Sequence, residues 1–263
     1  MSTTPTTPTT DDASTVSVSQ HTAPTSQAVA ALGQRLTHIT EHLLTLVTSL
    51  SEMAGRQAAP DTTQNLARLR EATLMDIQRG QADAVQLERA TRRALFGTGT
   101  TQLLLPQSLG GLEHPLVRLA RAYRAAFDAH GVALLLLADD QALMPGEASG
   151  LVERAAQAAK LLGRLTDLIY HERGLGSVAH LCENVGMLEN QADALYRSAV
   201  GALFGANGAT GVTSTAASAQ EQAQTRWTAE RAWRFHLLCA LEALPDRCED
   251  IADELMLVDY ALT

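Results

Sequence analysis

The stretch VAALGQRLTHITEHLLTLVTSLSEM, residues 29–53, places an apolar residue at every third or fourth position. This spacing keeps the apolar side chains on one face of an α-helix. It predicts one long amphipathic helix that ends near Gly55 and Pro60. The apolar seam of this helix consists of Val29, Leu32, Leu36, Ile39, Leu43, Leu46, Leu50 and Met53.

The same helical spacing continues along the chain, and we find no alternating pattern of the kind that predicts a β-strand. Three helices are predicted in each half. We therefore expect an all-α protein made of two packed three-helix bundles, at residues 26–145 and 146–263. After the first helix, the predicted helices cover residues 61–96, 115–143, 151–170 and 178–199, and a last helix carries apolar residues from 241 to 262.

Two short matches indicate an internal repeat that relates the two bundles. ALFG occurs at residues 94–97 and 202–205, and QADA precedes each copy, at residues 81–84 and 191–194. The two matches differ in offset by two residues, so their alignment needs an insertion or deletion. Each ALFG ends a predicted helix, which favours a repeated three-helix unit.

Residues 1–25 are rich in Thr, Pro and Ser, and we expect them to form a disordered tail because they hold few apolar side chains to bury. They lack the basic and apolar segments of a secretory signal. The chain has three cysteines and no Cys-x-x-Cys pair, which favours a reducing compartment. We therefore expect a cytoplasmic protein.

The charge balance argues against nucleic-acid binding. Twenty Lys and Arg residues face 29 Asp and Glu residues, which gives a formal net charge of −9. A phosphate backbone would be repelled by this excess of carboxylates. We therefore expect partners of another kind.

Carboxylates recur at helical spacing in the second half. Four residues make about one helical turn, so the two acids of a Glu-x-x-x-Asp pair face the same way. Two such pairs on adjacent antiparallel helices would offer oxygen ligands to a divalent metal. The other interpretation is a solvated acidic face. The candidate metal ligands are Glu189 and Asp193 in one pair, Glu242 and Asp246 in the other, and Asp250 and Asp253, which continue the second stripe.

Two segments carry a family resemblance. LENQADALYRSAVGALF at residues 188–204, followed by LEALPDRCEDIADELMLVDY at residues 241–260, resembles the PhoU-related phosphate-transport regulators. The closest branch is that of the Pit accessory proteins, which are usually found beside low-affinity phosphate transporters. The matching positions are Glu189, Asp193, Leu203, Phe204, Glu242, Asp246, Cys248, Glu249, Asp250 and Ala252.

The resemblance implies an all-α, regulatory and non-catalytic protein with two related three-helix bundles. It implies that the carboxylate pairs bind a divalent transition metal such as iron, zinc or manganese. The implied partner is a Pit-type membrane phosphate transporter, contacted at its cytoplasmic face. The protein would then be cytoplasmic, or peripheral at the inner membrane through that partner, and a homo-oligomer is open.

The first bundle offers no equivalent carboxylate pair. Aligning the ALFG segments places Gln81 and Val85 at the corresponding positions, whereas aligning the QADA segments places Arg79 and Asp83 there. We therefore expect a single metal site, in the second bundle. Asp83 is expected to have no partner.

The histidines do not follow a known metal-site pattern. None of the eight follows a Glu by three positions, so the signature of a di-iron carboxylate bundle is absent. His38 and His42 share a helical face, but we expect both to be exposed polar positions beside the seam.

Two other function classes compete with a metal-binding regulator. One is a metal-free helical adaptor whose acidic stripe contacts a basic protein surface. The other is an enzyme in which a carboxylate-bound metal hydrolyses phosphate esters. We do not expect an enzyme, because the sequence supplies no identifiable nucleophile or general base.

Overall fold

The computed structural model describes residues 23–56, 63–96, 114–137, 146–172, 175–205 and 217–262. These residues form six α-helices and no strand, which confirms the predicted all-α class. The helices are α1 (Ala23–Arg56), α2 (Thr63–Phe96), α3 (Pro115–Leu137), α4 (Gly146–Asp167), α5 (Leu175–Gly205) and α6 (Ala217–Leu262), and a short π-helix, η1 (Leu168–Glu172), continues α4.

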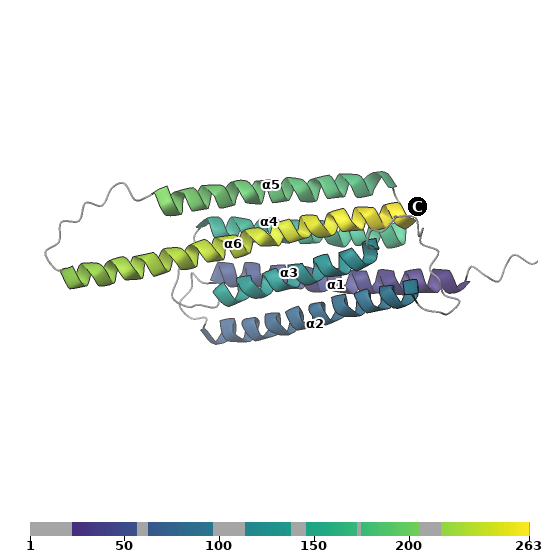
Figure 1. Cartoon of the computed structure of the whole chain (residues 1–263), viewed down its shortest axis with the longest axis horizontal. Coiled ribbons are helices and arrows are strands. Elements are labelled where there is room, and N and C mark those ends of the chain that lie inside the picture. Colours follow the sequence, from purple (N-terminus) through teal and green to yellow (C-terminus); the bar gives the residue numbers. More distant parts are fainter. Residues whose placement is uncertain are drawn as a thin grey trace, which may run out of the picture.

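The helices lie side by side along one long axis, and each runs antiparallel to the one before it (Figure 1). Helices α1 to α3 pack on one another, and so do α4 to α6. The two groups meet where α1 lies against α4 and α3 against α6. Apolar side chains from all six described helices form one continuous core. The internal repeat and the domain boundaries stay predictions.

Most predicted helix ends agree with the structure to within six residues, and the largest difference is at α6, which begins at Ala217 and not near residue 241. Helix α1 begins at Ala23, so the last three residues of the predicted tail are helical. Residues 1–22 lie outside the described residues. Helix α3 is described as far as Leu137, and the rest of its predicted range, residues 138–143, also lies outside.

The apolar seam of α1 is buried, as its spacing predicts. From Leu32 to Met53, no seam residue is more than 8 % exposed. Burial of one Leu or Ile side chain contributes about 1.5–3 kcal/mol. The fully buried members are Leu36, Ile39, Leu43, Leu46 and Leu50.

A glycine allows α2 and α3 to approach each other closely. A Cβ atom on Gly80 would lie only 2.2 Å from Cζ of Phe127, whose ring is fully buried. Any larger residue would therefore push the ring of Phe127 out of its place between the helices. Gly33 has the same role for Tyr170 of η1, because its Cβ would lie 2.7 Å from the tyrosine ring.

A buried polar contact joins the two halves. Thr40 of α1 donates its hydroxyl hydrogen to the carbonyl oxygen of Leu36, at 2.8 Å. The hydroxyl of Tyr123, on α3, therefore donates to Oγ1 of Thr40, at 2.6 Å. Oγ1 of Thr166, on α4, lies 3.4 Å from the same oxygen. Three helices from both halves thus meet at one satisfied hydroxyl group.

Helix α6 is 46 residues long, and its N-terminal part extends beyond the other helices (Figure 1). Pro245 lies inside this helix and is buried. Because proline has no backbone N–H, the carbonyl of Leu241 lacks its usual helical donor there. The helix nevertheless continues to Leu262. Across the described ranges, no helix has both the length and the apolar character needed to cross a membrane.

Candidate acidic site on α5 and α6

Two contacts fix the register of α5 against α6. A Cβ atom on Gly186 would lie 3.0 Å from Oε1 of Glu249, so the missing side chain makes room for this carboxylate. Further along α5, a hydrogen bond of 3.3 Å joins the hydroxyl of Tyr196 and Sγ of Cys239. From the first contact to the second, the residue number rises by ten on α5, from 186 to 196, and falls by ten on α6, from 249 to 239. The helices are therefore antiparallel and in step over this length.

The same register brings the two predicted carboxylate pairs together. Counting three residues along each helix from the first contact places Glu189 of α5 opposite Asp246 of α6. One turn further, Asp193 falls opposite Glu242. Two carboxylates from each helix thus form one face, which we call the acidic face. The two carboxylate pairs lie on facing antiparallel helices, and their binding of a metal stays a prediction.

The carboxyl groups of the acidic face influence one another. Burial is the largest cause that raises the pKa of Glu189, and the charges of Asp246 and Asp193 raise it further. The pKa of Glu242 is likewise raised by burial and then by Asp246, Asp193 and Glu189. Burial also raises the pKa of Asp246. A proton or a metal cation on this face would relieve the repulsion.

Glu249 belongs to the acidic face, although it was not among the predicted metal ligands. Burial raises its pKa, and the neighbouring charge of Glu189 is the next largest cause. Glu249 follows Glu242 by seven residues and Asp246 by three. This helical spacing is the signal that could have identified it, because both intervals keep a side chain on one helix face.

The other two predicted ligands lie at the edge of this face. Asp250 and Asp253 are both exposed. Asp250 pairs with Arg247 on its own helix, at 2.7 Å. Within the acidic face, Asp193 has a similar partner in Arg197, at 2.6 Å. Two of the six predicted ligands therefore already have an arginine beside them.

The carboxylates of the acidic face are half-buried between the two helices and solvent. In the part of the chain that the structure describes, three metal-ligating atoms come within 4.8 Å of one another only in the group His38, His42 and Asp83. Any metal on the acidic face would therefore need side-chain movement or bridging water to complete its coordination.

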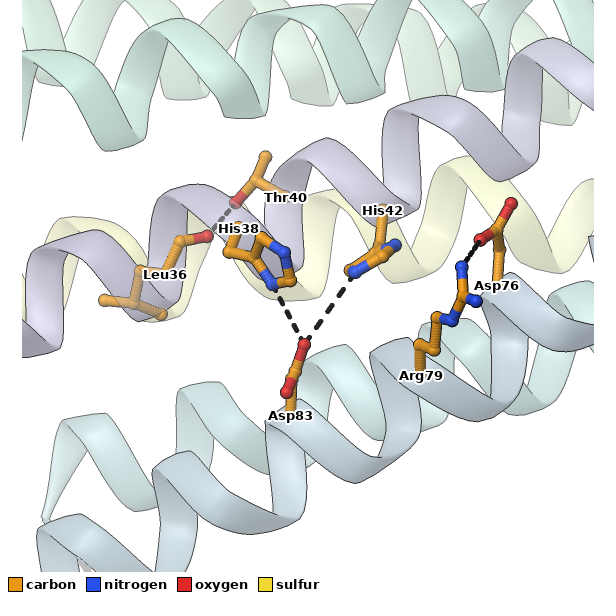
Figure 2. Close-up of polar contacts among 7 residues, drawn as sticks. All are labelled: Leu36, His38, Thr40, His42, Asp76, Arg79 and Asp83. Carbon is orange, nitrogen blue, oxygen red and sulfur yellow. Dashed lines mark hydrogen bonds and ion pairs between the residues drawn. The ribbon is translucent and has the colours of Figure 1, made fainter.

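His38, His42 and Asp83 form a cluster that sequence reasoning missed. Both histidines, from α1, point toward the aspartate on α2 (Figure 2). Oδ2 of Asp83 lies 3.0 Å from Nδ1 of His38 and 3.8 Å from Nε2 of His42. The expectation that Asp83 has no partner is therefore wrong. The expected exposure holds for the His38 side chain, which is 60 % exposed, but not for that of His42, which is 16 % exposed.

The cysteines have the properties of packing residues. Cys248 is fully buried, and burial raises its pKa to about 12. Burial likewise raises the pKa of Cys182 to about 11. Both thiols are therefore protonated at neutral pH, and the thiol is a much weaker nucleophile than the thiolate.

Neither the comparison with protein-family models nor that with curated proteins gives a match.

Proposed function

We propose that this protein is a non-catalytic, PhoU-like regulator of inorganic phosphate transport that binds a divalent transition metal on its acidic face. The observation that carries the metal-binding part is the register of α5 and α6, which sets Glu189 and Asp193 opposite Asp246 and Glu242. The phosphate-transport part rests on the resemblance of residues 188–204 and 241–260 to the PhoU-related regulators.

The proposed partner is a Pit-type membrane phosphate transporter, met at its cytoplasmic face. A cation bound between α5 and α6 would neutralise several carboxylates and hold the two helices together. The surface next to the metal would then be ordered for contact with the transporter. In this account the metal has a structural role, and the protein associates with the inner membrane only through its partner.

Thermal unfolding with added Mn²⁺, Fe²⁺ or Zn²⁺ tests the metal site. A cation that binds only the folded chain raises the melting temperature by mass action. The double variant Glu189→Gln, Asp193→Asn keeps side-chain size but removes two ligands, so the increase with Mn²⁺ should shrink sharply. The matched control is Glu183→Gln, Glu230→Gln, which removes two exposed charges from the same helices. Equal increases in both variants would refute the site.

Phosphate uptake by cells that carry a Pit-type transporter tests the physiological part. We expect uptake to change when this protein is removed, and the Glu189→Gln, Asp193→Asn variant should fail to restore it. The control variant Glu183→Gln, Glu230→Gln should restore it fully. Uptake that is the same with and without the protein would contradict a role in phosphate transport.

A metal-free adaptor is the second candidate, and the arginine partners of Asp193 and Asp250 favour it. These ion pairs show that guanidinium groups fit against the acidic stripe, as they would on a basic partner protein. An adaptor would bind such a partner equally well with and without a chelator. A metal-dependent regulator would lose its partner when the metal is removed.

A further inference from the structure

We infer that His38, His42 and Asp83 form a transition-metal site of the zinc class, which links α1 to α2 and is separate from the acidic face. The inference rests on the geometry of these three residues and does not depend on the proposed function. The site lies in the first half of the chain, whereas the acidic face belongs to the second half.

The local structure places the ligands correctly for one ion. His38 and His42 are four residues apart on α1, so both rings project from the same face. Their ring centroids are 4.5 Å apart and the ring planes are nearly perpendicular, at 86°. Asp83 reaches them from α2, the neighbouring helix (Figure 2). Two elements thus converge on one point.

The distances match a tetrahedral metal. Zinc–ligand bonds of about 2.0–2.1 Å at tetrahedral angles put two ligand atoms roughly 3.3 Å apart. The measured separations from Oδ2 of Asp83 are 3.0 Å to His38 and 3.8 Å to His42. A ligand atom of each residue lies within 4.8 Å of those of the other two. The side chain of His38 is largely exposed and can rotate to close the remaining gap.

The state of His42 favours a metal site over an ordinary ion pair. Its Nε2 atom is buried and has no hydrogen-bond partner. Oδ2 of Asp83 lies 3.8 Å from this nitrogen, which is too far for a hydrogen bond. The same oxygen instead forms a hydrogen bond with Nδ1 of His38. A buried polar atom without a partner costs stability. A metal bound to Nε2 would satisfy this atom.

The ligand types define the metal. Two imidazole nitrogens and one carboxylate suit Zn²⁺, Co²⁺ or Ni²⁺, whereas Ca²⁺ and Mg²⁺ prefer oxygen ligands alone. Three protein ligands leave the fourth tetrahedral position open. This position would be accessible to solvent, because the side chain of His38 is 60 % exposed. Water would fill this position. The bound ion would fasten α2 to the seam helix α1.

The test is a titration of tag-free, full-length protein with Zn²⁺ and Co²⁺. The parent for all variants carries Glu189→Gln and Asp193→Asn, so that the acidic face does not contribute. We expect one Zn²⁺ per chain, and Co²⁺ should give the visible absorption bands of a tetrahedral site with nitrogen ligands. Nitrogen NMR of the imidazole rings should show direct Zn²⁺ coordination by His38 and His42.

The variants His42→Gln, Asp83→Asn and His38→Gln should each weaken Zn²⁺ binding at least tenfold. The matched control His180→Gln removes an exposed histidine on α5 and should change nothing. Because His38 is exposed, its variant is expected to fold normally, which circular dichroism checks. A parent that binds no Zn²⁺, or unchanged affinity in the three variants, would show that the cluster is an ion pair only and would leave the proposed function standing.

Discussion

His130 is a histidine of α3 that is completely buried. Its Nδ1–H donates to the carbonyl oxygen of Ala126, at 2.7 Å, and its Nε2 has no hydrogen-bond partner. Burial lowers its pKa to about 4. The imidazole is therefore neutral in the folded protein over a range of pH in which the unfolded chain takes up a proton.

This difference predicts an acid-sensitive stability. Since the unfolded state binds the proton near pH 6.5 and the folded state only near pH 4, stability falls as the pH decreases between these values. By pH 5 the loss is about 2 kcal/mol. Urea unfolding of wild type and His130→Leu at pH 7 and pH 5 measures it. Between pH 7 and pH 5, the stability of His130→Leu should fall by about that much less than the stability of wild type. Equal losses in both proteins would contradict a neutral His130 in the folded state.

Gly80 allows a second prediction at the level of a single residue. In Gly80→Ala the new Cβ would lie 2.2 Å from the ring of Phe127, and both sites are buried. We expect a destabilisation of about 1–3 kcal/mol, measured by urea unfolding. The control is Gly131→Ala on α3, where a Cβ meets nothing within 4 Å. That variant should be neutral or slightly stabilised, because alanine favours helix.

At the scale of the helices, the acidic face should make the α5–α6 pair more stable in mild acid. The pKa values of Glu189 and Glu242 are raised in the folded state, so the folded protein binds more protons than the unfolded chain. The resulting penalty is fully present at pH 7 and is relieved as the pH falls toward the unfolded values near 4.5. This trend is opposite in sign to that of His130.

The double variant Glu189→Gln, Glu242→Gln isolates this contribution. It should be more stable than wild type at pH 7, by a few tenths of a kcal/mol for each repulsive pair removed. The gain should shrink as the pH is lowered toward the unfolded values near 4.5, and the contribution of His130 cancels because both proteins contain it. Glu183→Gln, on the exposed side of α5, is the control and should show no such trend. A gain that does not shrink between pH 7 and pH 4.5 would contradict the mechanism.

Helix prediction succeeded because the signal is local. The seam of α1 repeats every three or four residues, and burial of Leu36, Leu43 and Leu50 follows directly from that spacing. The pairing of Glu189 with Asp246 could be anticipated for a similar reason, because each carboxylate pair lies on one face of its own helix. Only the relative register of two antiparallel helices was missing.

The His38, His42 and Asp83 cluster could not be predicted in this way. The two histidines were recognised as sharing a face of α1, but their partner lies on another helix. The register of α2 depends on side-chain packing, such as Phe127 against Gly80, which leaves no periodic signal in the sequence. Glu249 differs, because its spacing from Glu242 and Asp246 is visible in the sequence, whereas the missing side chain of Gly186 that makes room for its carboxylate becomes apparent only in the structure.

At the scale of the whole molecule, the two halves share one core and one buried hydroxyl cluster. Tyr123→Phe removes the hydroxyl that donates to Thr40 across α1 and α3. Loss of this hydrogen bond should cost about 0.5–1.5 kcal/mol in thermal or urea unfolding. The control Tyr196→Phe removes a hydroxyl that contacts only a partly exposed thiol, and it should cost less. Equal costs would show that the buried cluster adds no special stability.

The proposed carboxylate site lies in the second half of the chain and the proposed histidine site in the first, so direct location of bound metal is the most direct test. Crystals of the full chain soaked in Mn²⁺ should give an anomalous difference peak between Glu189 and Asp193 on α5 and Glu242 and Asp246 on α6. The same peak should be absent from crystals of the Glu189→Gln, Asp193→Asn variant. A wild-type map without density at the acidic face, at saturating Mn²⁺, would contradict the central claim.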